Sequence, residues 1–339
     1  MKNISEHILE IKNLNVEFPI FGGIIQHEVS CVHAVKDFNL KVRQGETIAV
    51  VGESGSGKST LGKAIINVLK LTAPDVRVTG EMLLYHKDNY IDLLKLNRKE
   101  MIHFRSDIQM IFQDPYSSLN PRMIVKDIIQ EPMDIQGILT ESEKVEKVLF
   151  LLDKVGLSKE QSTRYPHEFS GGQRQRIGIA RALATDPKII IADEPVSALD
   201  VSIQAQVINL MMDLQDEFNL SYLFIAHDLS VVEHISDKIV VMYLGNIVEM
   251  GDSVNVYHHP KHPYSRALLS AVPVPDPNQK NKSRVVLKGD IPTPMNKPSG
   301  CAFRTRCPIA KPECAKDIPT LIDTGNDHWI ACPYWEEKF

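Results

Sequence analysis

The sequence predicts an α/β fold built on a parallel sheet, and two patterns support this prediction. Four short runs are almost wholly apolar, namely 47–51, 189–192, 222–226 and 239–243. Strands that are buried on both faces of a parallel sheet have this composition. Between some of the runs, apolar residues recur at helical spacing, as over 203–214. Buried strands that alternate with helices favour a parallel α/β core.

The first 50 residues follow a different pattern. Apolar and polar residues alternate along two stretches, 14–18 and 38–43. A period of two indicates strands with one buried and one exposed face, as in an antiparallel sheet. We therefore expect an antiparallel β subdomain at the start of the chain.

Residues 114–170 are expected to form a helical subdomain inserted in the α/β core. Thr140 and Glu143 have the spacing of a capping box, which marks the beginning of a helix. Apolar residues then recur on one face from Val145 to Val155, and Gly156 supplies a stop.

The C-terminal part of the chain differs in composition from the rest. Of the 20 prolines, 12 lie from Pro260 onward, together with four of the five cysteines. Residues 260–298 are expected to be extended with little regular structure, because proline does not continue helices or inner strands. At roughly 150 residues per domain, a chain of 339 residues predicts two domains, which we place at 1–257 and 258–339.

Composition and charge exclude several classes of protein. The formal net charge is −5, which gives no electrostatic reason to expect nucleic acid as a partner. The longest apolar runs are far shorter than the ~20 residues that span a bilayer, and no targeting segment is recognisable. We therefore expect a cytosolic or peripheral chain, in which clustered cysteines hold metal more often than they form disulfides.

A phosphate-binding loop is predicted directly after the first buried strand. Residues 52–60 read GESGSGKST and match G-x-x-x-x-G-K-[ST], followed by a helical stretch. Backbone N–H groups of such a loop surround phosphate oxygens, Lys58 can reach the β- and γ-phosphates, and Ser59 can ligate Mg²⁺. The candidate contacts are Gly52, Ser54, Gly55, Ser56, Gly57, Lys58, Ser59 and Thr60.

An acidic pair follows the second buried strand. Asp193 and Glu194 come directly after 189–192, at the carboxyl end of the strand, where open α/β sheets bind ligands. We expect Asp193 to hold Mg²⁺ through water and Glu194 to polarise the attacking water. The alternative is an acidic strand end that merely stays solvated.

The segment 169–173 reads FSGGQ, and it narrows the range of phosphate-loop protein families that the chain can resemble. It resembles the LSGGQ signature of ATP-binding cassette (ABC) proteins, with Phe169 in place of leucine. The resemblance implies the RecA-like P-loop NTPase fold of an ABC nucleotide-binding domain. It also implies that Ser170, Gly171, Gly172 and Gln173 face the ATP held by a partner subunit in a head-to-tail dimer.

Further residues match the ABC pattern in the expected order. Gln113, after the apolar stretch 108–112, resembles the Q-loop glutamine that contacts Mg²⁺. The segment 197–200 resembles the D-loop, which places Asp200 at the nucleotide, and His227 resembles the switch histidine near the γ-phosphate. Phe18 is the candidate for stacking on adenine, and a core phenylalanine is the alternative. Phe21 and His33 are competitors for that role.

A narrower resemblance covers nearly the whole chain. The stretches 113–122, 165–173 and 262–273 look like those of the ATPases of oligopeptide/dipeptide importers, and Phe169 and the segment 271–277 look like the F-type subunits. The resemblance implies an ATPase on the cytoplasmic face of the cell membrane that powers peptide import. It also implies a D-type ATPase subunit as heterodimer partner, two transmembrane permease subunits and an extracytoplasmic peptide-binding protein. Importers of nickel or metallophores share much of the pattern.

The four late cysteines have the spacing C-x5-C-x6-C-x17-C, at Cys301, Cys307, Cys314 and Cys332. Four thiolates can hold Zn²⁺ or a [4Fe–4S] cluster, and the spacing does not choose between them. The resemblance of 298–301 and 306–308 to the importer ATPases implies an iron–sulfur cluster. Zinc and reduced structural cysteines are the alternatives.

Two other function classes stay open at this point. A soluble ABC ATPase that acts on ribosomes or DNA would use the same core, but ribosomal types typically carry two cassettes and DNA types long coiled coils. An iron–sulfur regulatory or redox module with a secondary ATPase is the other class.

Overall fold

The computed structural model describes residues 7–23, 27–272, 285, 287 and 289–337. The chain forms two compact units. Unit 1 comprises residues 1–10, 41–47 and 82–225, and unit 2 comprises 11–40, 48–81 and 226–339.

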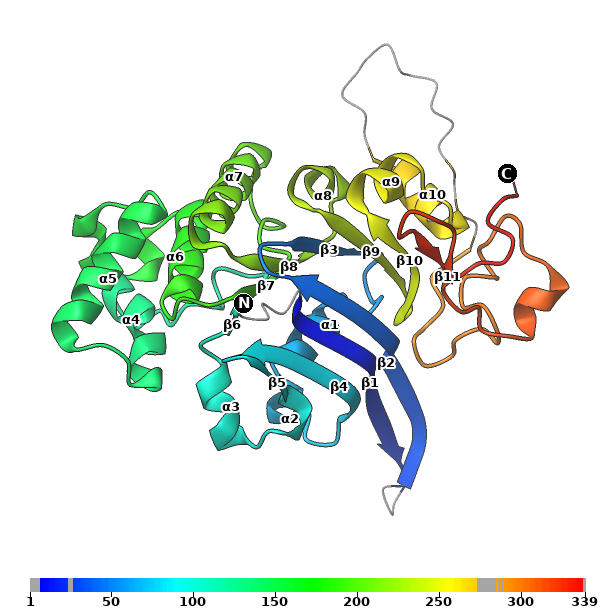
Figure 1. The fold of residues 1–339 in the computed structure, drawn as a ribbon, viewed down its shortest axis with the longest axis horizontal. Helices are drawn as coiled ribbons and strands as arrows, with labels where there is room; N and C mark the ends of the chain where they lie inside the picture. The colour runs from blue at the N-terminus through cyan, green and yellow to red at the C-terminus, as the bar shows by residue number, and fades with distance from the viewer. Residues whose placement is uncertain (1–6, 24–26, 273–284, 286, 288, 338–339) are drawn as a thin grey trace, which may run out of the picture. The chain divides into compact units, whose positions relative to one another are not determined.

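Unit 1 contains three parallel strands in the order β8-β7-β6 (Figure 1). These are β6 (Ile108–Ile111), β7 (Ile189–Asp193) and β8 (Ser221–Ala226). Every residue of β7 and β8 is buried, which confirms the expectation for runs that are apolar on both faces. The predicted strand at 108–112 ends one residue early, and the Phe112 side chain is exposed.

A helical cluster in unit 1 is formed by α4 (Val125–Gln136), α5 (Glu141–Lys154) and α6 (Gly171–Leu183), which pack on one another (Figure 1). Thr140 and Glu143 form the predicted capping box at the start of α5. Gly156 follows the helix with a φ of 70°, so the predicted stop is also confirmed. The remaining elements of this unit are β5 (Asn89–Asp92), α3 (Arg98–Phe104), α7 (Val201–Phe218) and short 3₁₀ turns at Leu93–Lys95, Lys159–Thr163 and Pro166–Glu168.

The predicted antiparallel sheet has four strands in the order β2-β1-β4-β5. Its long strands are β1 (His7–Gly22), β2 (His27–Arg43) and β4 (Arg77–His86). Phe38, Leu40 and Val42 are buried while the residues between them are exposed, as the period of two predicts.

In unit 2, a run of neighbouring strands in one sheet has the order β11-β12-β10-β9-β3. Strand β3 (Thr47–Val51) is parallel to β9 (Lys238–Tyr243), whereas β10 (Asn246–Asp252) is antiparallel to β9. We call residues 258–339 the C-terminal extension. Its two short strands, β11 (Ile322–Asp323) and β12 (Trp329–Ile330), continue the sheet beyond β10. The helices are α1 (Lys58–Ile65), α2 (Leu69–Thr72), α8 (Leu229–Ile235), α9 (Ser253–His258) and α10 (Pro263–Ser270), with a 3₁₀ turn at Pro312–Ala315.

The expectation that 260–298 is extended is wrong for its first part, because α10 lies there. Pro263 occupies the first turn of the helix, where its missing N–H is not needed. The Nδ1 atom of His262 accepts a hydrogen bond from the Tyr264 N–H at 3.1 Å and caps the helix. Residues 273–284, 286 and 288 lie outside the described residues, and so does most of the segment 271–277 that resembles F-type subunits.

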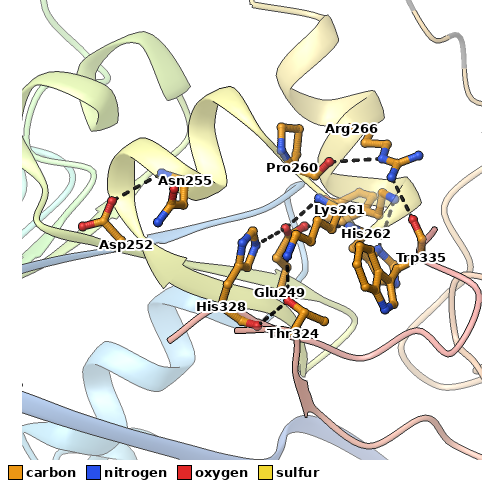
Figure 2. Close-up of polar contacts among 11 residues, drawn as sticks. Glu249, Asp252, Asn255, Pro260, Lys261, His262, Arg266, Thr324, His328 and Trp335 are labelled. Atoms are coloured by element: carbon orange, nitrogen blue, oxygen red, sulfur yellow. Dashed lines mark hydrogen bonds and ion pairs between the residues drawn. The ribbon is translucent and has the colours of Figure 1, made fainter. Parts of the chain in front are cut away.

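A buried carboxylate fastens the C-terminal extension to the sheet of unit 2 (Figure 2). Glu249 of β10 is fully buried and lies 2.7 Å from Nε2 of His328, the residue before β12. The same carboxylate accepts hydrogen bonds from the backbone N–H groups of Lys261 and His262 at 2.8 and 2.9 Å. One side chain therefore joins β10, the start of α10 and the C-terminal strands.

Among the helices in the described part of the chain, none has both the length and the apolar character needed to cross a membrane.

Candidate functional site

The phosphate loop lies between β3 and α1, the strand-to-helix context that the motif requires. Gly57 has a φ of 104°, and a Cβ atom there would lie 2.1 Å from the carbonyl oxygen of Ala34. Gly52 is equally confined, with a Cβ position 2.2 Å from the carbonyl oxygen of Met242. Only glycine fits at these two positions, so the path of the loop backbone is determined by its neighbours in unit 2.

Lys58 begins α1, and its side chain turns back onto the loop. Its Nζ atom donates to the carbonyl oxygens of Gly52 and Glu53 at 2.8 and 3.1 Å. Ser59 and Thr60 follow in the first turn of the helix, and Ser54 and Gly55 are exposed at the loop tip. The backbone N–H groups at a helix N-terminus and a nearby ammonium group suit a polyphosphate with bound Mg²⁺.

The acidic pair lies at the carboxyl end of β7, as predicted. Asp193 is the last residue of the strand and is buried. Glu194 has a φ of 45°, and its N–H donates to the carbonyl oxygen of Ile225 at 2.9 Å. Its carboxylate accepts a hydrogen bond of 2.7 Å from Nε2 of Gln113. Because β6 and β7 are parallel neighbours, their carboxyl ends meet, which brings the Q-loop candidate to the catalytic candidate.

The signature segment caps α6. The Ser170 hydroxyl accepts a hydrogen bond from the N–H of Gln173 at 3.3 Å, and the Gln173 side chain accepts one from the N–H of Ser170 at 3.0 Å. A Cβ atom at Gly172 would lie 2.5 Å from the Ile203 side chain, so only glycine lets α6 approach α7 this closely. Asp200 is the exposed N-cap residue of α7.

The remaining candidates belong to unit 2. His227 is exposed directly after β8. Phe18 is half-buried on β1 and is not part of the core, while Phe21 is exposed. His33, the other competitor for the adenine site, has its Nδ1 atom 3.0 Å from the carboxylate of Glu17.

The four cysteines of the extension line one cavity of about 350 Å³ in unit 2. Burial raises the pKa of the Cys307 thiol to about 12 and that of Cys332 to about 11, and the neighbouring thiols add to both shifts. Of the residues that the structure describes, no three His, Cys, Asp or Glu are placed as a group that could hold a metal ion. The number and chemistry of the donors fit a thiolate-bound metal, but the placed side chains do not form its coordination geometry. Cys31 lies apart on β2.

Two residues that contact the phosphate loop are not indicated by any sequence pattern. Arg306 pairs with the carboxylate of Glu53, and the Tyr264 hydroxyl accepts a hydrogen bond from the Glu53 N–H. Glu53 occupies a variable position of the loop motif, and Arg306 is 253 residues away from it, so no local signal connects them.

Comparisons with known proteins show the family and the fold. A family described as "ABC transporter" matches residues 35–197, and one described as "Oligopeptide/dipeptide transporter, C-terminal region" matches residues 248–314. Among solved structures, the ADP- and Pi-bound dimer of the ATP-binding cassette MJ0796 is 27% identical, with a TM-score of 0.59 over 72% of this chain and 98% of that chain. CbiO1 from Clostridium perfringens, part of the ABC transporter complex cbiONQ, is 26% identical, with a TM-score of 0.61 over 75% and 92% of the two chains.

Curated relatives are similar along almost the whole length. The oligopeptide transport ATP-binding protein OppF of Escherichia coli is 53% identical, over 96% of this chain and 95% of its own. OppF of Haemophilus influenzae is 52% identical, over 98% of both chains, and AppF of Bacillus subtilis is 50% identical, over 96% and 97%. With the ABC fold, the phosphate loop and these full-length matches, the chain belongs to the family of oligopeptide ABC transporter ATP-binding proteins, which are ATPases.

Proposed function

We propose that this chain is the ATP-hydrolysing subunit that energises the import of oligopeptides or dipeptides through a membrane ABC transporter. The similarity to oligopeptide transport ATP-binding proteins, at about half of all positions and over 96% or more of the chain, carries this proposal. It favours peptides over nickel or metallophores as cargo, and it gives no support to a role on ribosomes or DNA.

The residues of the phosphate loop hold the nucleotide in this proposal. Backbone N–H groups of 52–60 bind phosphate oxygens, Lys58 binds the β- and γ-phosphates, and Phe18 stacks on adenine. Mg²⁺, held by Ser59, Gln113 and Asp193, would neutralise charge on the β- and γ-phosphate oxygens. Gly52 and Gly57 support the assignment, because the absence of a side chain lets the loop backbone pass close to neighbouring carbonyl oxygens in a conformation that other residues rarely adopt.

Glu194 is the catalytic base. It accepts a proton from water as the water oxygen attacks the γ-phosphorus, the bond to the bridging oxygen breaks, and ADP and phosphate form. The 2.7 Å hydrogen bond from Gln113 supports this role because it orients the carboxylate. His227 stabilises the charge that develops on the γ-phosphate. Asp200 and residues 170–173 act on the nucleotide of the partner subunit.

The proposal includes the partners and the location. A D-type ATPase subunit forms the heterodimer, and two permease subunits and an extracytoplasmic peptide-binding protein complete the importer. The chain then lies on the cytoplasmic face of the cell membrane as a peripheral subunit. Copurification of the permease subunits with the full chain from membranes tests this arrangement.

We also propose that Cys301, Cys307, Cys314 and Cys332 bind a [4Fe–4S] cluster rather than zinc. The cavity that all four line supports a shared bound group, because a metal bound there would stabilise the thiolates that burial alone disfavours. The anaerobically purified chain should absorb visible light, as iron–sulfur clusters do, and it should contain iron. Zinc in place of iron, or neither metal, would contradict the proposal.

ATP binding and hydrolysis test the central assignment. Lys58→Ala should lose ATP affinity because the loop loses its ammonium group, whereas Glu194→Gln should retain ATP and lose turnover. Lys63→Ala, in the last turn of α1, is the matched control for the lysine. Normal hydrolysis by Lys58→Ala or by Glu194→Gln would overturn the assignment of that residue.

A further inference from the structure

The C-terminal extension holds one residue of the phosphate loop through both its side chain and its backbone. The Nη1 and Nη2 atoms of Arg306 lie 2.6 and 3.0 Å from the two carboxylate oxygens of Glu53. The N–H of the same residue donates to the Tyr264 hydroxyl at 2.8 Å. All three residues belong to unit 2. A planar guanidinium that binds both oxygens of a carboxylate holds it in one orientation.

The two groups that hold Glu53 are themselves fixed. The Arg306 side chain is only 8% exposed, and Nη1 also lies 3.5 Å from the Tyr243 hydroxyl. Tyr264 is fully buried, and its ring packs on those of Tyr243 and Phe303 at centroid distances of 4.7 and 5.4 Å. Burial raises the pKa of Tyr264 above its usual range, so the hydroxyl is neutral and can accept the bond. The extension therefore presents a preorganised support to the loop.

The position of residue 53 directly affects Lys58, the lysine that binds the phosphates in the proposed function. Its carbonyl oxygen accepts a hydrogen bond from Nζ of Lys58 at 3.1 Å. A shift of the Glu53 backbone would therefore move a contact of the ammonium group that binds the phosphates. The tyrosine holds the N–H side of this residue, and the lysine contacts its carbonyl side.

Charge gives the second reason for the pair. Glu53 puts a carboxylate in a loop that binds a polyphosphate, and two anions at close range repel one another. The bidentate arginine compensates this charge where solvent screening is reduced, because the Glu53 side chain is only 24% exposed.

We propose that Arg306 and Tyr264 are positioning residues of the ATP site: Tyr264 orients the loop backbone at Glu53, and Arg306 neutralises the Glu53 carboxylate. The inference rests on the proposed function, because it concerns the same nucleotide site. Removal of the arginine leaves an uncompensated anion beside the phosphates and weakens ATP binding. Removal of both charges, that of Arg306 and that of Glu53, restores ATP binding.

Binding of Mg²⁺-ATP by the full chain, measured by calorimetry, tests the proposal. Arg306→Gln should weaken the affinity at least about tenfold, the effect of removing one partner of a largely buried charge pair. The double variant Glu53→Gln/Arg306→Gln should return to within about threefold of the original chain, because no charge is left unpaired. Tyr264→Phe should weaken it about threefold or more, since the Glu53 N–H loses its acceptor.

A control and a kinetic readout separate positioning from folding. Lys311→Gln removes a cation of the extension that pairs with Glu337 and does not touch the loop, so its affinity should equal that of the original chain. For ATP hydrolysis, Arg306→Gln should raise KM while kcat changes little. If the double variant binds as weakly as Arg306→Gln, the arginine acts only by docking the extension, and the proposal is overturned.

The outcomes also distinguish this proposal from the proposed function. A chain that binds no ATP would overturn both. A chain that binds ATP through Lys58 but does not respond to Arg306→Gln would overturn only the positioning role.

Discussion

Substitution of Glu249 is expected to detach the C-terminal extension before the rest of the chain unfolds. The carboxylate is fully buried and accepts three hydrogen bonds, from His328 and from the backbone of Lys261 and His262. In Glu249→Ala, the His328 ring and the two backbone N–H groups remain buried and lose their hydrogen-bond acceptor. Glu249→Gln keeps one oxygen acceptor and is the conservative comparison.

The magnitude follows from the burial of the pair. Breaking a buried, hydrogen-bonded pair costs about 3–5 kcal/mol, of which each orphaned polar group accounts for about 1–3 kcal/mol. With a urea m-value of about 2 kcal/mol/M, Glu249→Ala should lower the midpoint of detachment by about 2 M. Glu249→Gln should lower it by about half as much.

The two tryptophans of the chain make this measurable. Trp329 and Trp335 both lie in the extension, so tryptophan fluorescence follows the extension while far-UV circular dichroism follows the whole chain. For Glu249→Ala, the fluorescence transition should precede the dichroism transition. Coincident transitions at the original midpoint would refute the reasoning. Glu233→Gln, a substitution of a partly exposed carboxylate that pairs with His258, is the matched control and should leave both midpoints in place.

Three other predictions follow from the structure. Gly57→Ala should abolish ATP binding in a filter assay, because the Cβ atom would lie 2.1 Å from the Ala34 carbonyl oxygen. Gly178→Ala, a substitution within α6 with nothing within 4 Å of the added Cβ atom, should bind ATP normally, and equal binding by both variants would contradict the steric argument. Burial lowers the pKa of His262 to about 4. As the pH drops from 6.5 to 4, His262 therefore becomes protonated in the unfolded chain before it does in the folded chain, and the stability of the fold should decrease. His262→Asn should lose this part of the pH dependence in thermal melts, and an unchanged pH profile would contradict it. Phe18→Ala should weaken ATP more than Phe21→Ala does, and the reverse order would move the adenine site to Phe21.

Local signals were predictable from the sequence because a few adjacent residues determine them. The capping box of Thr140 and Glu143 and the Ser170 cap of α6 require only residues three positions apart. The burial of β7 and β8 follows from their unbroken apolar runs. The meeting of Gln113 with Glu194 then follows from the parallel pairing of two such strands.

Other features depend on contacts that no local pattern encodes. The proline content of 260–298 predicts an extended chain, yet Pro263 stands in the first turn of α10, where it favours the helix. The ion pair between Glu53 and Arg306 joins residues that lie 253 positions apart in the sequence. Burial of Glu249 could not be predicted either, since a carboxylate is buried only when its partners converge on it from distant segments.

Peptide uptake by the reconstituted transporter tests the central claim most directly. The full chain, with its permease and ATPase partners in proteoliposomes and with peptide-binding protein on the opposite side, should accumulate labelled oligopeptide only when ATP is supplied. Replacement of the chain by its Glu194→Gln variant should stop accumulation while ATP binding persists. Undiminished ATP-driven uptake with that variant would contradict the assignment of this chain as the hydrolysing subunit.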